Sequence, residues 1–212
     1  MDMDCLLRQT FEHRRPLRLV ETPCSSAVML LLIMRDEGES GLLLTRRHAG
    51  LRSYSDDWCL PGGRREPIDA SLLACAWREL EEETGISKQT CLLLGELDDF
   101  YNGNGDLVRP FVCVMEEINL IDKLQLQASE AVAAVLFPIP ELACIVEDHE
   151  QRFPSQRQPA YLLDLDKQGI AQGCVWGLTA SILLHFRDVL TGQVSPLCRG
   201  EKFKRDEAIR GY

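Results

Sequence analysis

The 212-residue sequence predicts an α/β fold in which a mixed β-sheet carries helices on both faces. Short apolar runs of strand length alternate along the chain with longer segments in which apolar residues recur every three or four positions. Only some of the predicted strands are far enough apart for a crossover connection, so a mixed sheet is favoured over a wholly parallel one. Hydrophobic residues make up 45% of the chain and charged residues 26%, which is enough apolar material for a sizeable core.

The predicted strands are short apolar runs bounded by turn-forming loops. One of them, AVMLLLI, spans only seven residues and is too short for a transmembrane helix or a normal signal peptide, so we interpret it as a buried strand. Loops such as RDEGES and NGNG separate the runs. The expected strands cover residues 27–34, 41–46, 91–97, 108–116 and 132–138.

Three segments have helical patterns, at residues 69–84, 139–146 and 177–190. In the first of them, Asp69 suits the N-cap position and Gly85 suits the position just after the helix. The residues expected on its buried face are Leu73, Trp77, Leu80 and Thr84.

The pattern of elements predicts one main domain over residues 21–192. An N-terminal extension covers residues 1–20, and a charged C-terminal tail covers residues 193–212. Both ends fit two interpretations, unstructured segments or packed helices. No internal repeat or low-complexity segment interrupts the domain.

Charge and cysteine content narrow the class of protein. A net charge of −10 and a sequence pI near 4.9 argue against nucleic acid or an anionic membrane as the main partner. We expect a small-molecule substrate and, as one option, a homodimer. The nine cysteines are scattered without a CxxC pair, which fits neither a disulfide framework nor a zinc site and predicts the cytoplasm or another reducing compartment.

The stretch RELEEETG, residues 78–85, places four glutamates near the end of the first predicted helix. Glu79, Glu82 and Glu83 share an arc of roughly 100° on one flank, whereas Glu81 points away. Like charges at this spacing and carboxylates near a helix C-terminus are both unfavourable, and Arg78 alone cannot neutralise them. A divalent cation could, and carboxylate oxygens suit Mg²⁺ or Mn²⁺. The alternative is a solvated acidic face.

A glycine-containing loop, WCLPGGRREPID, stands immediately before the acidic helix. Together with RELEEETGI it resembles the Nudix box, in which a Gly-Gly loop, a carboxylate and an REUxEExGU helix form a loop-helix-loop site for metal-assisted pyrophosphate hydrolysis. The commonest box has seven residues between its first carboxylate and the arginine. Here Asp69 replaces the usual glutamate, and eight residues separate it from Arg78.

This longer spacing is similar to that of the coenzyme A pyrophosphatase branch of the Nudix family, which has a PGGxxDxxD form. Glu66 and Asp69 are the matching residues. Upstream, LLLTRRHAGLRSYSDDWCLPGG resembles the pattern of that branch, although Tyr54 and Asp56 replace its His and Gly. Similar segments downstream extend the resemblance over residues 27–190.

The resemblance implies a Nudix-like α/β/α sandwich and a set of site residues. Arg78 would orient the glutamates, Glu82 or Glu83 would assist in deprotonating water, and Glu130 is a second candidate base whose alternative role is a solvated loop residue. The implied ligands of Mg²⁺ or Mn²⁺ are Glu79, Glu82 and Glu83. The backbone at Gly62 and Gly63 would approach the metal or substrate.

Five arginines fall within twenty residues of an otherwise acidic protein and form a local basic patch, and arginine forks suit phosphate. Its members are Arg46, Arg47, Arg52, Arg64 and Arg65. Of these, Arg47 and Arg52 coincide with the branch pattern, while a role in surface solubility is the alternative for each. Trp58 either stacks on a base or packs in the core, and we expect His48 at the surface rather than as a metal ligand.

Three functions are compatible with these residues. The first is cleavage of coenzyme A or acyl-CoA to 3′,5′-ADP and 4′-phosphopantetheine or its acyl form. The second is the same chemistry on ADP-ribose, a nucleotide sugar or a dinucleotide, because the box determines the diphosphate chemistry and not the attached groups. The third is an inactive nucleotide-binding or protein-binding module, against which the complete set of helix glutamates argues.

Overall fold

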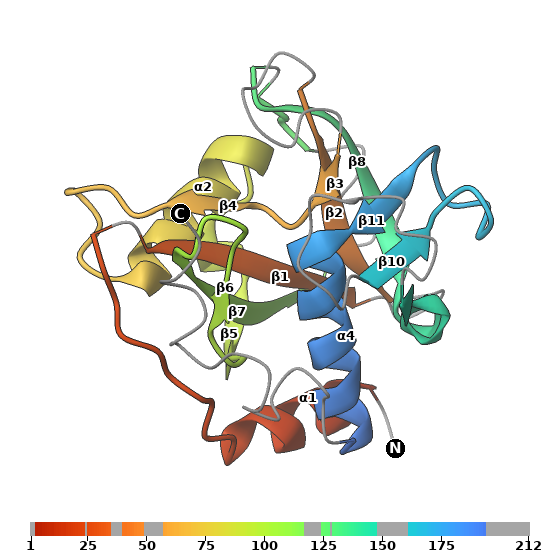
Figure 1. The fold of residues 1–212 in the computed structure, drawn as a ribbon, viewed down its shortest axis with the longest axis horizontal. Coiled ribbons are helices and arrows are strands. Elements are labelled where there is room, and N and C mark those ends of the chain that lie inside the picture. Colours follow the sequence, from red (N-terminus) through yellow and green to blue (C-terminus); the bar gives the residue numbers. More distant parts are fainter. Residues whose placement is uncertain are drawn as a thin grey trace, which may run out of the picture.

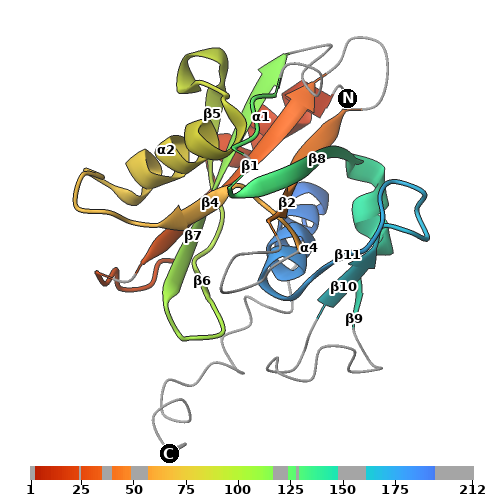
Figure 2. The ribbon, with the colours of Figure 1, turned by 90° about the horizontal axis from the view of Figure 1, so that it is seen from above.

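The computed structural model describes residues 3–23, 25–34, 40–48, 57–116, 124–127, 129–147 and 161–193. A central mixed sheet separates helix α2 on one face from helices α1 and α4 on the other (Figures 1 and 2). This arrangement confirms the predicted α/β/α sandwich.

The central sheet has eight strands, with the order β3-β2-β1-β7-β5 along its main path. Strands β1 and β7 are parallel, and the other pairs in this sheet are antiparallel, which confirms a mixed sheet. Its long strands correspond to the five predicted ones: β1 (Ser26–Met34), β2 (Gly41–Arg47), β5 (Leu92–Glu96), β7 (Leu107–Glu116) and β8 (Ala131–Pro138).

Several short strands complete the architecture. Three belong to the central sheet, where β3 (Trp58–Cys59) pairs with β2, β4 (Gly62–Arg64) with β1, and β6 (Phe100–Tyr101) with β7. A second, three-stranded sheet has the order β11-β10-β9. Its strands are β9 (Val146–Glu147), β10 (Tyr161–Asp164) and β11 (Cys174–Trp176).

The alternation of side chains along β1 divides the core into two halves. Leu30 and Leu32 face the half that contains α1 and α4, whereas Met29 and Leu31 face the half that contains α2. All four side chains are fully buried. A strand that is apolar on both faces therefore marks the centre of the sandwich.

Helix α2 (Leu72–Thr84) begins later than predicted. Ser71 is the N-cap, and its side chain accepts a hydrogen bond from the Ala74 amide, because the Asp69 carboxylate is engaged elsewhere. The prediction for the other end is confirmed: Gly85 has a φ of 73° and donates its N–H to Glu81 O at 2.8 Å.

The buried face of α2 is also rotated from the predicted one. Leu80 and Thr84 are buried as expected, but Leu73 and Trp77 are only half-buried. The remaining buried positions are Leu72, Cys75, Ala76 and Glu83. The helix therefore turns a glutamate, as well as apolar side chains, toward the sheet.

The other two expected helices have different outcomes. Helix α4 (Gly177–Thr191) confirms the prediction for residues 177–190. The predicted helix over 139–146 is wrong: a 3₁₀ segment, η2 (Ile139–Cys144), leads directly into β9. The segment is only six residues long before the chain enters β9 at Val146, and short pieces of this kind commonly form 3₁₀ hydrogen bonds. A further 3₁₀ turn, η1 (Lys88–Thr90), follows α2.

The N-terminal segment packs as a helix, one of the two interpretations of this end. Helix α1 (Met3–Glu12) contacts β5 and α4, and the Phe11 and Phe186 rings stack with centroids 6.4 Å apart. Residues 14–21, which we call the N-terminal arm, run from α1 to the start of β1. Residues 194–212 of the predicted tail lie outside the described part of the chain.

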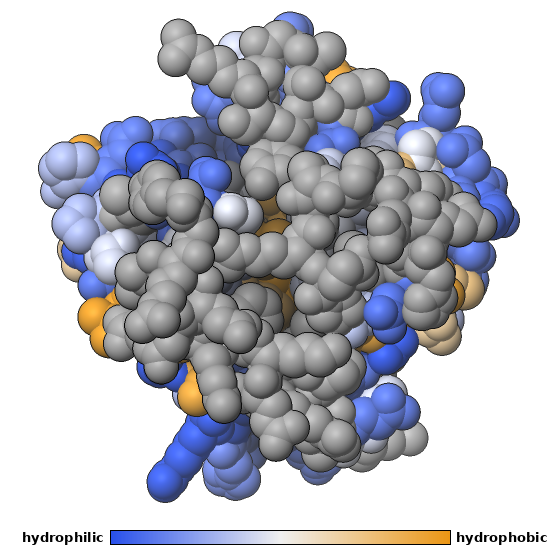
Figure 3. All heavy atoms as spheres, viewed as in Figure 1, coloured by the Kyte–Doolittle hydropathy of each residue, from blue (hydrophilic) through white to orange (hydrophobic). Residues whose placement is uncertain are grey.

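Most of the coloured surface visible in Figure 3 is hydrophilic. In the view of Figure 3, its hydrophobic residues form small separate patches. No helix within the described ranges has the length and apolar character needed to cross a bilayer. The seven described cysteines are free thiols, while the reducing compartment stays a prediction.

Candidate active site

Two glycines bring the loop before α2 close to its neighbours. A Cβ added at Gly62 would lie 2.4 Å from Ala27 O and 2.7 Å from Val28 Cα, so only glycine lets β4 lie this close to β1. A Cβ added at Gly63 would lie 2.3 Å from Glu79 Oε1. The glycine pair therefore makes room for a carboxylate against the loop.

Three carboxylates converge beside this loop. Glu79, Glu83 and Glu130 have oxygens that all lie within 4.8 Å of one another. Glu83 is 3% exposed, and the side chain of Glu79 is 12% exposed. Three oxygen donors at this spacing fit a hard divalent cation such as Mg²⁺ or Mn²⁺. We call these residues the carboxylate cluster.

Glu130 reaches the cluster from a distant part of the chain. The His48 amide donates to Glu130 O at 2.7 Å, and the Gln127 amide donates to Glu83 O at 3.3 Å. The register of β2 and β8 shifts between Arg46 and Arg47, leaving Val132 as an extra residue in β8. These contacts place Glu130 over the C-terminal turn of α2.

Burial makes the cluster costly to ionise without a cation. It raises the pKa of Glu83 to about 8, and the nearby charge of Glu79 acts in the same direction. The Gly62 amide, 3.4 Å from Glu83 Oε1, opposes this rise, as does the charge of Arg47. Burial also raises the pKa of Glu79. A bound cation would offset this repulsion.

Arg78 ties the loop to the helix. Its Nε and Nη2 donate to the two Asp69 oxygens at 3.1 and 3.0 Å, and Nη2 also donates to Arg64 O at 3.2 Å. Its Nη1 lies 3.0 Å from Glu79 Oε1 and 2.9 Å from Glu82 Oε2. Hydrogen bonding from Arg78 lowers the pKa of Asp69. The guanidinium thus holds the loop carboxylate and Glu79 in one network.

The structure separates Glu82 from the other two predicted ligands. Its side chain is 48% exposed and pairs with Arg78, and the carboxylate cluster contains Glu130 in its place. Glu79 and Glu83 lie one helical turn apart on the side facing the loop and sheet, whereas Glu82 is rotated by about 100° from Glu83.

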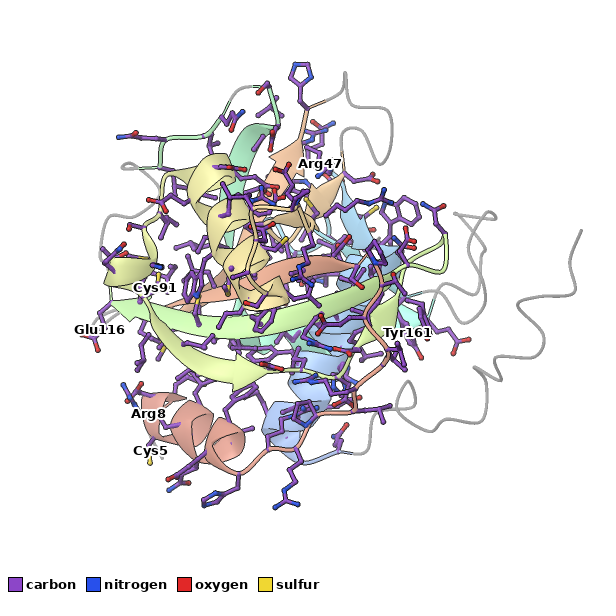
Figure 4. All side chains as sticks on the ribbon, turned by 90° about the vertical axis from the view of Figure 1, so that its left-hand side faces the viewer. Cys5, Arg8, Arg47, Cys91, Glu116 and Tyr161 are labelled. Atoms are coloured by element: carbon purple, nitrogen blue, oxygen red, sulfur yellow. The ribbon has the colours of Figure 1, made fainter. Side chains whose placement is uncertain are left out.

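The predicted phosphate-binding arginines of β2 point to opposite faces of the strand. Arg46 lies over the Trp58 ring, with its guanidinium carbon 6.0 Å from the ring centroid. Arg47, labelled in Figure 4, is on the face of Thr45, whose hydroxyl is 3.5 Å from Glu83 Oε2. The Arg47 Nε is buried and has no hydrogen-bond partner among the described residues. Of the two, Arg47 is the one placed near the carboxylates.

The other predicted residues have varied positions. Arg64 pairs with Asp106 at 3.2 Å and is 61% exposed, and Arg52 lies outside the described residues. Trp58 is buried and donates its Nε1 proton to Gln172 O at 2.9 Å, which supports the core-packing interpretation.

Sequence reasoning missed Thr45 as part of the site. It is 1% exposed and lies between Glu83 and the Cys59 thiol, 3.7 Å from its sulfur. The sequence did contain a signal for Thr45. Side chains alternate between the two faces of a strand, so Thr45 lies on the same face of β2 as Arg47, next to the glycine loop.

Comparison with known proteins identifies the family. A model of the NUDIX domain matches residues 25–159. The chain belongs to the Nudix family. Nudix hydrolases act on nucleoside diphosphate derivatives and generally need divalent ions such as Mg²⁺ or Mn²⁺.

Two bacterial relatives cover most of this Nudix chain. It is 32% identical over 177 residues to an uncharacterized Nudix hydrolase, NudL, of Photorhabdus laumondii, covering 79% of this chain and 86% of the relative. It is 30% identical to the NudL of Yersinia enterocolitica, covering 74% of this chain and 77% of the relative.

Solved Nudix structures are more distant. A MutT/nudix family protein from Enterococcus faecalis has 20% identity and a TM-score of 0.47, covering 90% of this chain and 70% of that protein. The Nudix domain of Shewanella oneidensis NrtR, solved with ADP ribose, has 17% identity and a TM-score of 0.45, covering 68% of this chain and 87% of that domain.

Proposed function

We propose that this Nudix hydrolase cleaves the diphosphate of coenzyme A or acyl-CoA, giving 3′,5′-ADP and 4′-phosphopantetheine or its acyl form. The convergence of Glu79, Glu83 and Glu130 within 4.8 Å carries the metal-dependent part of this proposal. The upstream sequence pattern that contains Arg47 and Arg52 supports the choice of coenzyme A.

Glu79 and Glu83 are the proposed metal ligands. A bound Mg²⁺ or Mn²⁺ supplies positive charge that neutralises the diphosphate and favours attack by water. Arg78 keeps Glu79 in place through its 3.0 Å contact, and the Gly62 amide and Thr45 hydroxyl orient the two oxygens of Glu83. Glu82, which the sequence also predicts as a metal ligand, acts in this proposal only by pairing with Arg78.

Glu130 is the proposed general base. Both oxygens of Glu83 already accept hydrogen bonds, at 3.4 and 3.5 Å, whereas Glu130 is half-buried at the outer side of the cluster. It takes a proton as water attacks one phosphorus, and the bond from that phosphorus to the bridging oxygen breaks. The bridging oxygen leaves on the other phosphate with its electron pair.

Arg47 is the proposed phosphate contact. Its buried Nε has no hydrogen-bond partner among the described residues, and its guanidinium acts electrostatically on Glu83. A substrate phosphate beside the cluster would satisfy that donor and would prefer the fork of an arginine.

A substrate panel tests the choice of coenzyme A. The 3′-phosphate of coenzyme A adds a charge of about −1.5 to −2 by analogy with other phosphomonoesters, and arginines that meet it would be left unpaired by dephospho-coenzyme A. We expect kcat/KM with Mg²⁺ to be roughly ten-fold or more higher for coenzyme A, and Arg52→Ala to reduce that ratio. Equal efficiency on both forms would discard coenzyme A as the substrate.

The second candidate is another nucleoside diphosphate derivative. Tyr54 and Asp56 depart from the coenzyme A pattern, which favours keeping ADP-ribose and nucleotide sugars in the same panel. Faster cleavage of one of these would select this alternative and leave the metal-dependent chemistry in place.

A further inference from the structure

The side chain of Arg65 bridges the N-terminal arm and the loop that precedes α2. Its Nε donates to Asp69 O and its Nη2 to Ala70 O, both at 3.3 Å. Its Nη1 lies 3.6 Å from Glu21 Oε2 in the arm. Arg65 therefore holds the two carbonyls immediately before Ser71, the residue that caps α2.

Glu21 is itself fixed by a second arginine. Its Oε1 accepts a hydrogen bond from Arg109 Nη1 at 2.6 Å. Arg109 also binds both oxygens of Asp99, at 2.7 and 2.8 Å. Because the Asp99 side chain is fully buried, this pair gives Glu21 a rigid anchor in the sheet.

The arm is attached to the same acidic corner through its backbone. The Leu17 amide donates to Asp98 at 2.9 Å, and the Leu19 amide donates to Asp99 at 2.8 Å. Arg14 adds a 2.6 Å ion pair with Asp98. The arm lies outside the segment that matches the family model, residues 25–159, yet it is built into the domain.

These contacts form a continuous path from the arm to the carboxylate cluster. It runs from Glu21 to Arg65, along the loop to Asp69, and through Arg78 to Glu79. Within the loop, the Glu66 amide donates to Asp69 Oδ2 and the Asp69 amide to Glu66 O, so a shift at Asp69 moves the whole turn.

We propose that Arg65 and Glu21 are positioning residues for the metal site, an inference that rests on the proposed metal-binding role of Glu79. Arg65 sets the place of Asp69, Asp69 sets the place of Arg78, and Arg78 aligns the Glu79 carboxylate. An arginine suits this task because its planar guanidinium spreads its donors over three nitrogens and can reach two neighbouring carbonyls and a carboxylate at once, whereas lysine has a single nitrogen.

The test is Mn²⁺ affinity, measured from the electron paramagnetic resonance signal of free Mn²⁺ on the full chain. Arg65→Gln is expected to weaken binding about ten-fold, the scale for residues that orient metal ligands. Glu21→Gln should weaken it about two- to five-fold, as an exposed ion pair allows. The double variant should bind no more weakly than Arg65→Gln alone, because the two residues act on one path.

Arg14→Gln is the matched control. Arg14 belongs to the same arm and pairs with Asp98 and with Glu96 O, but it contacts neither Asp99 nor the loop among the described interactions. It should lower the melting temperature while leaving Mn²⁺ affinity unchanged. Glu21 is partly exposed, so Glu21→Gln tests the inference even if Arg65→Gln fails to fold.

The outcomes separate this inference from the proposed function. Wild-type affinity in both Arg65→Gln and Glu21→Gln overturns the positioning role alone. An equal loss in Arg14→Gln also overturns it, because the effect would then come from general loosening of the arm. A wild-type protein that binds no Mn²⁺ overturns the metal site and this inference together.

Discussion

Gly63 and Glu79 are packed so closely that a Cβ on the glycine would lie 2.3 Å from a carboxylate oxygen. The obstructing atoms are at the end of a flexible side chain, so Glu79 can move aside. At Gly62 the obstructing atoms include the backbone of Ala27 and Val28, which cannot. Adjacent glycines therefore serve different purposes, one for the site and one for the sheet.

Alanine substitutions should separate these two purposes. We expect Gly63→Ala to keep nearly wild-type stability but to lose Mn²⁺ affinity and activity by about ten-fold or more, as for a displaced metal ligand. Gly62→Ala should lower the free energy of unfolding by about 1–3 kcal/mol, the usual scale of overpacking. Urea unfolding and Mn²⁺ titration of both variants check this, and a Gly63→Ala protein with normal Mn²⁺ affinity would contradict it.

The helix glutamates should differ in their contribution to the rate. Glu83→Gln removes a buried member of the cluster and is expected to lose at least about two orders of magnitude in kcat, with the fold retained. Glu82→Gln removes only a partner of Arg78, so a loss of about ten-fold is expected. Steady-state rates with Mg²⁺ decide this. A larger loss in Glu82→Gln would return Glu82 to the ligand set.

The metal-free protein should become less stable as the pH rises. Burial raises the pKa of Glu83 to about 8, so the folded state keeps a proton there that the unfolded state has lost above about pH 4.3. Because the folded state binds more protons in this interval, Glu83 lowers the free energy of unfolding by about 1.4 kcal/mol per pH unit between about pH 5 and 8. Below about pH 4.3 Glu83 is protonated in both the folded and the unfolded state, so this loss of stability is absent.

Urea unfolding in EDTA at pH 5, 6, 7 and 8 measures this slope. Glu83→Gln is the control, since other groups titrate in both proteins and only the difference belongs to Glu83. Parallel pH profiles in the two proteins would show that Glu83 is already ionised in the folded state.

Arg47 should matter more for substrate binding than for the fold. Arg47→Met removes a guanidinium whose Nε has no described hydrogen-bond partner but whose charge acts on Glu83, so the free energy of unfolding should change by about 1 kcal/mol or less. The KM for the diphosphate substrate should rise about ten-fold, as for loss of a charge-assisted contact. Arg46→Met is the comparison from the opposite strand face, and a larger rise in KM there would contradict the assignment.

Trp58 should act as a core residue. Trp58→Phe keeps an aromatic ring but loses the 2.9 Å hydrogen bond from the indole N–H to Gln172 O, which should cost about 1–2 kcal/mol of unfolding free energy. The KM should stay within about two-fold of the wild-type value. A normal stability together with a large rise in KM would instead indicate base stacking.

Much of the fold could be predicted because its long strands and helices carry strong periodic patterns. The strand over 27–34 and the helix over 177–190 are examples in which apolar spacing alone suffices. Strands of two or three residues, such as β3, carry no periodicity and were missed. The N-cap of α2 was misplaced because Asp69, a good capping residue, binds Arg78 and the Glu66 amide instead.

The candidate site was harder to predict than the box that marks it. Helical geometry grouped Glu82 with Glu79 and Glu83, yet the third carboxylate comes from Glu130. Its position depends on how β8 pairs with β2 and on the extra residue at Val132, and neither can be read from local sequence.

The pairing of β8 with β2 makes the carboxylate cluster a product of long-range chain assembly. A chain that ended before Glu130 and β8 would contain the whole glycine loop and helix α2 but only two of the three carboxylates. Cation binding is therefore linked to completion of the sheet, and a cation at about one hundred times its Kd would stabilise the assembled state by about 2.7 kcal/mol. A divalent cation bound here would act as a folding ligand as well as a catalytic cofactor, so depletion of the ion would shorten the lifetime of the enzyme as well as stop turnover.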